Sequence, residues 1–168
     1  IMDAEFFAYL EQHADDLNAR EPAVLRQVIA RCCRLKADVV QADEREVTGL
    51  RAVLNYGHTF GHAVEAESGY GEVLHGEAVS MGMLAASRLA ERLGRIGSDV
   101  TQRQDELLTR LGLPVKMPSE LEPEVLLASM GRDKKVAHGQ LRLVLPSRLG
   151  HVELVSDVPR QDVLAAMR

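Results

Sequence analysis

Hydrophobic residues recur at three- and four-residue steps over most of the chain, which is the period of an amphipathic α-helix. The first such run spans residues 6–17. A second opens at Pro22, a residue favoured in the first turn of a helix, and continues to about Ala42. The segment from Glu77 to Leu93 is apolar almost all round. Because a helix with no polar face must be covered on all sides, this segment predicts a buried central helix.

The hydrophobic period changes near the end of the chain. Leu141, Leu143 and Leu145 alternate with other residues, and a second alternating run contains Val152 and Leu154. Residues 146–150 separate the two runs as a turn would, so a small β-hairpin is predicted. Shorter helices are predicted at about residues 101–111, 124–130 and 160–167. The sequence therefore predicts a mainly α fold with a small β-hairpin near the C-terminus, in one domain over residues 1–168 or in two small ones at most.

Composition narrows the class of protein. With 168 residues, 46% of them hydrophobic, the chain is long enough to bury a core of its own. A net charge of −5, without a run dense in Lys and Arg, argues against nucleic acid or an acidic membrane as a partner. No apolar run approaches the roughly 20 residues of a membrane span, and the first residues are not those of a signal peptide. A cytoplasmic protein is therefore predicted.

Two features of the first 33 residues qualify this picture. The chain opens with Ile1 and Met2 inside a helical pattern and has no methionine in first place, so we expect a fragment. The two cysteines, Cys32 and Cys33, are adjacent and lack the spacing of a zinc or redox motif. They are predicted to be ordinary thiols, one of them facing the core.

Three of the six histidines fall in one short region. His58 and His62 are four residues apart, so on a helix they project from the same face. His75 follows a glycine-rich turn and precedes the long apolar helix, so a hairpin of helices would bring it back to the first pair. Imidazole is a common metal ligand, and a catalytic metal needs about three protein groups and an open position. The region predicts a metal or anion site, with structural or surface histidines as the alternative.

The same region excludes one class of enzyme. Metalloproteases of the HExxH type carry a glutamate directly after the first histidine. Thr59 stands in that position here, so this class is a poor fit. Arg51 and Asn55 precede His58 at four- and three-residue steps, and on a helix they would share a face with His62. Such a face offers hydrogen-bond donors to an anion.

Other charged residues have two readings each. Lys36 lies among apolar positions of the second helix, where it either points into a cleft or extends along the surface. Lys134 and Lys135 precede the hairpin and either add positive charge to a site or are simply solvated. Spacing gives no role to Glu46 or Glu65.

Several long motifs, taken in order, resemble 3-dehydroquinate synthase. They are LKADVV at residues 35–40, DERE at 43–46, GLRAVLNYGHTFGHA at 49–63, LHGEAV at 74–79, RDKKV at 132–136 and LVLP at 143–146. The resemblance runs over nearly the whole chain. It implies the helical C-terminal domain of that family, a domain that binds metal and substrate.

The resemblance implies an enzyme of the shikimate pathway and of aromatic amino acid biosynthesis. Enzymes of this family are phosphorus–oxygen lyases, which convert 3-deoxy-D-arabino-heptulosonate 7-phosphate into 3-dehydroquinate and phosphate. It uses NAD and a divalent metal, Zn²⁺ or alternatively Co²⁺. In the family's sequence of steps a ring hydroxyl is transiently oxidised by NAD, phosphate is eliminated, the ketone is reduced, and the ring opens and closes as a carbocycle.

The resemblance also implies roles for single residues. His58 and His75 match metal ligands, whereas His62 matches a residue that contacts substrate. The remaining matches are to residues that contact substrate: Lys36, Arg51, Asn55, Lys134 and Lys135. Of the adjacent pair Lys134 and Lys135, one matches a residue near the phosphate. Arginine and lysine suit a substrate that carries a carboxylate and a phosphate, because both form charge-assisted hydrogen bonds.

Two departures from the family pattern limit these roles. Between Glu46 and Arg51 the chain holds one residue more than the usual spacing, which leaves the role of Glu46 open. The family's NAD-binding half and its third metal ligand, a glutamate, lie upstream of Ile1, and the chain has no G-x-G-x-x-G fingerprint. The chain by itself is therefore expected to bind metal weakly and to be inactive, and the complete protein to be a homodimer. The alternatives are a related sugar phosphate cyclase, such as 2-deoxy-scyllo-inosose synthase, and an inert helical domain.

Overall fold

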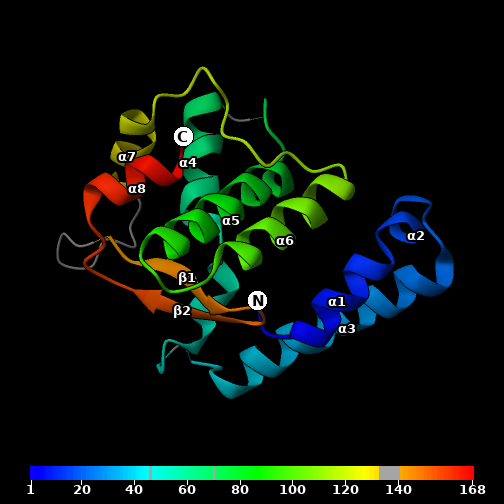
Figure 1. The fold of residues 1–168 in the computed structure, drawn as a ribbon. Coiled ribbons are helices and arrows are strands. Elements are labelled where there is room, and N and C mark those ends of the chain that lie inside the picture. Colours follow the sequence, from blue (N-terminus) through cyan, green and yellow to red (C-terminus); the bar gives the residue numbers. More distant parts are fainter. Residues whose placement is uncertain (46, 70, 133–140) are drawn as a thin grey trace.

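Helices dominate the computed structural model, which describes residues 1–45, 47–69, 71–132 and 141–168 (Figure 1). A two-stranded antiparallel sheet lies near the C-terminal end, so the predicted fold class is confirmed. The elements are α1 (Ala4–Gln12), α2 (Ala14–Asn18), α3 (Pro22–Ala42), the 3₁₀ helix η1 (Leu50–Asn55), α4 (His58–Ser68), α5 (His75–Arg92), α6 (Ser98–Arg110), α7 (Pro123–Arg132), β1 (Leu143–Arg148), β2 (His151–Val155) and α8 (Arg160–Ala166).

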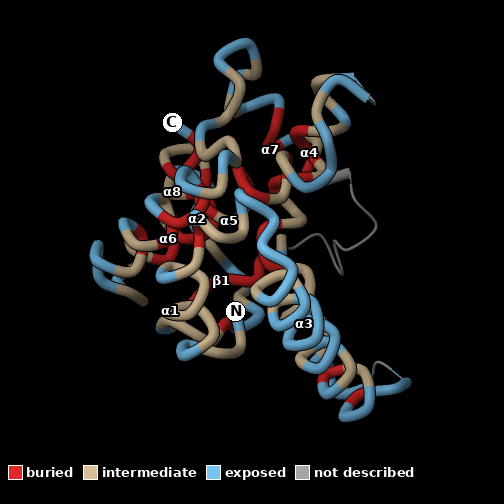
Figure 2. The backbone as a smooth tube through the Cα atoms, turned by 90° about the vertical axis from the view of Figure 1, so that its right-hand side faces the viewer, coloured by how far each residue is buried: buried red, intermediate tan, exposed pale blue. Residues whose placement is uncertain are grey.

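Helix α5 forms the centre of the molecule. It packs against α4, α6, α8 and β1, and its Leu84 and Leu89 are fully buried. Figure 2 shows the buried positions concentrated in α4, α5, α7 and β1, whereas α3 is largely exposed. The predicted central helix is thus confirmed, with its first residue at His75 instead of Glu77.

Three glycines allow α4 and α5 to touch through their backbones. A β-carbon at Gly82 would overlap the carbonyl oxygen of Gly57 and lie 2.8 Å from the nitrogen of Gly61. A β-carbon at Gly61 would lie 3.0 Å from the carbonyl carbon and oxygen of Ala78. Since real β-carbons do not make such contacts with backbone, this crossing requires glycine and fixes the first turns of α4 against α5.

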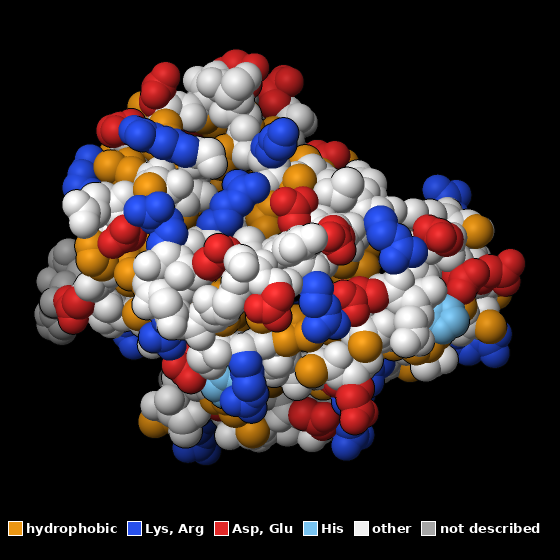
Figure 3. Space-filling model, in the orientation of Figure 1, with side chains coloured by type: hydrophobic (Ala, Val, Ile, Leu, Met, Phe, Trp, Pro, Cys, Tyr) orange, Lys and Arg blue, Asp and Glu red, His pale blue; other side chains and the backbone are white. Residues whose placement is uncertain are grey.

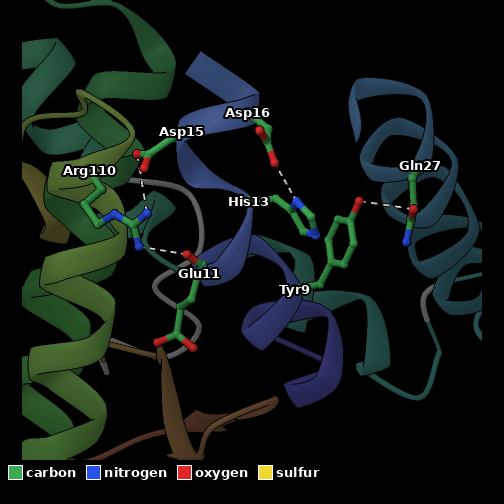
Figure 4. Close-up of polar contacts among 7 residues, drawn as sticks. All are labelled: Tyr9, Glu11, His13, Asp15, Asp16, Gln27 and Arg110. Carbon is green, nitrogen blue, oxygen red and sulfur yellow. Dashed lines mark hydrogen bonds and ion pairs between the residues drawn. The ribbon is translucent and has the colours of Figure 1, made fainter. Parts of the chain in front are cut away.

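The first two helices are attached to the body of the molecule by polar contacts (Figure 4). The Arg110 guanidinium on α6 donates to the carbonyl of Glu11 at 2.7 Å and lies 3.4 Å from the carboxylate of Asp15. The Tyr9 hydroxyl donates to Gln27 on α3 at 3.1 Å. Close to this region, Arg103 forms a two-pronged pair with the Glu11 carboxylate at 2.9 and 2.7 Å.

The opening hydrophobic run is divided in two. The sequence predicts one amphipathic run over residues 6–17, but α1 ends at Gln12 and α2 begins at Ala14. The His13 between them has a non-helical φ of −113° and ψ of 20°, and its Nδ1 lies 2.7 Å from the carboxylate of Asp16. The contact joins the residue between the two helices to the first turns of α2, and the chain is interrupted where the pattern alone shows no break.

The expectation that one cysteine faces the core is wrong. Cys32 and Cys33 are both exposed free thiols. Their helix, α3, buries only Val39 among its 21 residues. Neighbouring elements therefore cover little of the hydrophobic stripe that the sequence pattern assigned to a core.

The predicted hairpin is confirmed. Strand β1 pairs antiparallel with β2, with Leu143 opposite Val155 and Val144 opposite Leu154. Strand β1 extends to Arg148, so the turn is shorter than the five residues that separate the two alternating runs in the sequence. Leu143 and Leu145 are 1% and 0% exposed, which attaches the hairpin firmly to the core beside α5.

The distribution of charge can be followed on one face of the molecule. On the face drawn in Figure 3, acidic and basic side chains are interspersed and form no single-sign patch. No helix in the described part of the chain is long and apolar enough to cross a membrane.

Candidate metal centre

Three imidazole rings converge where α4 meets the start of α5. The ring centroids are 5.5 Å apart for His58 and His62, 5.3 Å for His58 and His75, and 5.9 Å for His62 and His75. His58 and His62 come from consecutive turns of α4, and His75 is the first residue of α5. The helical hairpin predicted from the sequence therefore brings His75 back to the first pair.

The start of α4 is set by Gly57. This glycine has a φ of +79°, in the left-handed region that a side chain disfavours, and it separates η1 from α4. Arg51 and Asn55 lie on η1, so they do not continue the helical face of His58 and His62. The expectation of one continuous α-helical face is corrected: these donors lie on a 3₁₀ helix that precedes α4.

The ring of His58 is held by the backbone. Its Nδ1 lies 3.2 Å from the carbonyl oxygen of Tyr56, a contact in which the ring N–H donates. The Tyr56 side chain is buried, and its hydroxyl lies 3.0 Å from the carbonyl of Met83 and 2.9 Å from Gln104. Burial raises the pKa of Tyr56 far above its usual range, so the hydroxyl stays protonated. Tyr56 thus fixes the backbone on which His58 depends.

The ring of His75 is held by a side chain. Both carboxylate oxygens of Glu65, one turn after His62 on α4, lie 3.2 Å from His75 Nδ1. The Glu65 side chain is 20% exposed and that of His75 is 57% exposed. Spacing alone gave Glu65 no role, although its position three residues after His62 was a usable signal.

These residues fit a divalent metal. Histidines that ligate metal usually donate the second ring nitrogen to a carbonyl or carboxylate, which fixes the tautomer. The Nδ1 atoms of His58 and His75 both have such acceptors, with Nε2 as the nitrogen for a metal. A second donor set also exists, because ligand atoms of His62, Glu65 and His75 all lie within 4.8 Å of one another. The first set is supported by the anchored Nδ1 atoms and a centroid distance of 5.3 Å between His58 and His75, and the second by the close approach of its ligand atoms.

The predicted anion-binding residues occupy different places. Arg51 and Asn55 are half-buried on η1, directly before the histidines. Lys36 is exposed on α3 and lines a cavity of about 260 Å³ together with Leu54 of η1 and residues of α1. Lys134, Lys135 and Glu46 lie outside the described residues.

Asp43 is a residue that sequence reasoning missed. It is 4% exposed, and its carboxylate accepts hydrogen bonds from the backbone N–H groups of Val47, Thr48 and Arg51 at 2.8, 3.0 and 3.4 Å. These bonds, that from Thr48 first, lower the pKa of Asp43 below its usual range. Asp43 therefore shapes the segment that leads into η1. The signal in the sequence was an aspartate directly after the helical pattern that ends at Ala42, a position where aspartate side chains often accept hydrogen bonds from nearby backbone N–H groups.

Comparison with known proteins identifies the family. The family model described as 3-dehydroquinate synthase C-terminal matches residues 1–136. The chain belongs to this family. A solved structure of ValA, a 2-epi-5-epi-valiolone synthase from Streptomyces hygroscopicus subsp. jinggangensis 5008 with NAD⁺ and Zn²⁺ bound, is 28% identical. The match covers 99% of this chain and 46% of that one, with a TM-score of 0.86.

A second solved structure gives the same picture. A 2-deoxy-scyllo-inosose synthase complexed with carbaglucose-6-phosphate, NAD⁺ and Co²⁺ is 25% identical, with a TM-score of 0.74. That match covers 88% of this chain and 41% of the other. This member of the 3-dehydroquinate synthase family thus spans under half the length of the solved sugar phosphate cyclases that it resembles. It corresponds to the C-terminal part of proteins in this family.

Proposed function

We propose that this chain carries the metal- and substrate-binding part of a 3-dehydroquinate synthase. The single observation that carries the proposal is the meeting of His58, His62 and His75, with the Nδ1 atoms of His58 and His75 already engaged by acceptors. The substrate would be 3-deoxy-D-arabino-heptulosonate 7-phosphate, and the products 3-dehydroquinate and phosphate. The family match over residues 1–136 supports an enzyme of this family, and the long ordered motifs that resemble 3-dehydroquinate synthase favour this activity.

His58 and His75 would hold the divalent metal, Zn²⁺ or Co²⁺. When bound, such a metal polarises a hydroxyl and lowers the cost of an alkoxide. The structure supports these two ligands through their anchored Nδ1 atoms, because an anchored ring presents Nε2 in a fixed direction. A third ligand would be a carboxylate from outside this chain, so the chain alone would bind metal weakly.

His62 would contact the substrate. It lies one turn after His58, with its ring 5.5 Å from His58 and 5.9 Å from His75. A group bound beside both ligands therefore lies within reach of this imidazole, which suits it to hydrogen bonding or proton transfer. Arg51 and Asn55 on η1, with Lys36, Lys134 and Lys135, would bind the carboxylate and phosphate of the substrate.

The NAD would be bound by a separate domain. The chain has no dinucleotide-binding fingerprint, and the solved relatives that it covers to 46% and 41% contain NAD⁺. We propose that the enzyme works as a homodimer in the cytoplasm, in which each chain supplies the helical side of one active site.

A different sugar phosphate cyclase is the second candidate. The solved relatives act as 2-epi-5-epi-valiolone synthase and 2-deoxy-scyllo-inosose synthase, and both match this chain over 88% or more of its length. The ligands of the two candidate enzymes differ in charge. The seven-carbon acid 3-deoxy-D-arabino-heptulosonate 7-phosphate has a carboxylate as well as a phosphate, whereas carbaglucose 6-phosphate has only the phosphate. A site built for the first should therefore lose most of its affinity without the carboxylate.

The test is phosphate release by the cyclase domain joined to a NAD-binding domain, in the presence of NAD and Zn²⁺. Release from 3-deoxy-D-arabino-heptulosonate 7-phosphate, with 3-dehydroquinate formed in equal amount, is expected. Competition by carbaglucose 6-phosphate should be weak. Tight binding of carbaglucose 6-phosphate, measured directly, together with no turnover of the seven-carbon acid would favour the second candidate. Metal binding without turnover of any sugar phosphate would indicate an inert domain.

A further inference from the structure

Glu65 is a carboxylate in the metal centre to which neither the sequence nor the family resemblance gives a role. It lies on the inner face of α4, and both of its oxygens point to one ring nitrogen, Nδ1 of His75, at 3.2 Å. We propose that Glu65 is the positioning residue of His75: it accepts the Nδ1–H and directs Nε2 toward the metal. This inference rests on the proposed metal-binding function.

His75 needs such a partner more than His58 does. It is the first residue of α5, its side chain is 57% exposed, and a β-carbon on the neighbouring Gly76 would meet nothing within 4 Å. The ring is largely exposed, with the ring centroids of His58 and His62 5.3 and 5.9 Å away, so other rotamers are open to it, and each one lowers the population that is ready to bind metal. A carboxylate that is itself only 20% exposed provides a fixed acceptor on the neighbouring helix α4.

The arrangement at His58 supports a positioning role over a ligand role for Glu65. At His58 the acceptor for Nδ1 is the Tyr56 backbone carbonyl, at 3.2 Å. Glu65 stands at the same distance from the same nitrogen of His75. The two proposed ligands thus share one pattern, in which an acceptor holds Nδ1 and leaves the metal to Nε2. If Glu65 bound the metal directly, His75 would lose this acceptor.

The first test uses the metal-free chain and needs no activity. Long-range ¹H–¹⁵N NMR spectra, recorded at about pH 8.5 where imidazole is neutral, distinguish the Nδ1–H from the Nε2–H tautomer. We expect His75 to be the Nδ1–H tautomer in the wild-type chain and to shift toward Nε2–H in Glu65→Ala. Glu65→Gln should keep the wild-type pattern in large part, because its amide oxygen still accepts. Glu67→Ala, on the opposite face of α4, is the matched control.

The second test measures metal binding. Co²⁺ affinity should fall roughly 10–100-fold in Glu65→Ala, as is typical for partners of metal-bound histidines, and recover most of this in Glu65→Gln. The visible spectrum of the Co²⁺-saturated chain should be the same in all three, because the inner ligands do not change. A spectrum that shows a different coordination number in both variants would make Glu65 a ligand and overturn the inference.

The two tests also separate this inference from the proposed function. An unchanged His75 tautomer in Glu65→Ala overturns the positioning role, even if the metal binds as proposed. Conversely, a wild-type chain that binds no Co²⁺, alone or joined to a NAD-binding domain, overturns the proposed function. In that case the tautomer still decides whether Glu65 holds the ring.

Discussion

Gly82 on α5 lies so close to the carbonyl oxygen of Gly57 that a β-carbon at residue 82 would overlap that oxygen. Gly57 is the residue directly before His58, and α5 begins with His75. The contact therefore sets the distance between the two helices that carry the three imidazoles. The arrangement of the imidazoles at one end of α5 therefore depends on close backbone packing further along the same helix.

Gly82→Ala should destabilise the fold by about 1–3 kcal/mol, because the added methyl meets backbone that cannot rotate away. Urea denaturation gives the free energy of unfolding. Gly76→Ala is the matched control on the same helix: it has open space around the added carbon, and alanine favours helix over glycine by about 0.5–1 kcal/mol. Equal stability of the Gly82 variant and the wild type would show that the two helices are not in contact at this crossing.

Single alanine substitutions of the three histidines should separate their roles. His58→Ala and His75→Ala should each lower Zn²⁺ affinity by more than about 100-fold, since losing a ligand costs more than losing its outer partner. His62→Ala should leave metal content near normal and reduce turnover strongly. Metal content is measured by elemental analysis after dialysis. Turnover is measured with the chain joined to a NAD-binding domain.

The same three variants test the second donor set. If His62, Glu65 and His75 hold the metal, His62→Ala loses it and His58→Ala keeps it. That outcome would reverse the assignment of His58 and His62.

Tyr56→Phe should cost about 1–3 kcal/mol of stability, because the carbonyl of Met83 and the side chain of Gln104 lose their buried partner. Tyr9→Phe removes an exposed hydroxyl that donates to Gln27, so it should change the unfolding free energy by under about 1 kcal/mol. Because burial raises the pKa of Tyr56, ultraviolet titration of the folded chain up to pH 11 should be the same in wild type and Tyr56→Phe. A missing tyrosinate signal in the variant would place the hydroxyl in contact with solvent.

Asp43 should make stability depend on acid pH. Its pKa is lower in the folded chain than in the unfolded chain, so its carboxylate stabilises the fold above the ordinary aspartate pKa, and that contribution disappears as the pH falls through the lowered value. Urea midpoints at pH 7 and pH 3 should therefore differ more for wild type than for Asp43→Asn. Asp38→Asn, at an exposed ion pair with Arg34 on α3, is the control and should keep the wild-type pH dependence.

Amide hydrogen exchange locates the same effect. In Asp43→Asn the N–H of Arg51 loses a carboxylate oxygen, so exchange at Arg51 should accelerate at pH 7. If exchange at Arg51 and the urea midpoint at pH 3 relative to pH 7 were both unchanged in Asp43→Asn, Asp43 would not stabilise η1.

The sequence was sufficient for the parts of the fold that depend on periodicity. An apolar stretch without a polar face can only be a buried element, and α5 is the most buried helix among the described residues. The alternating leucines predicted the hairpin. The glycine-rich turn before His75 predicted that this residue lies close to α4. The order of the motifs was enough to predict the family.

Only the tertiary structure revealed the contacts between residues that no local sequence pattern connects. Glu65 lies ten residues from His75 in sequence and meets it only because α4 and α5 cross at Gly57 and Gly82. The break at Gly57, which places Arg51 and Asn55 on a 3₁₀ turn, is likewise set by that crossing. Periodicity reports which side of an element is apolar, whereas hydrogen-bond direction and backbone contact depend on where the neighbouring element lies. The three histidines were therefore evident from the sequence, and the acceptors that orient two of them were not.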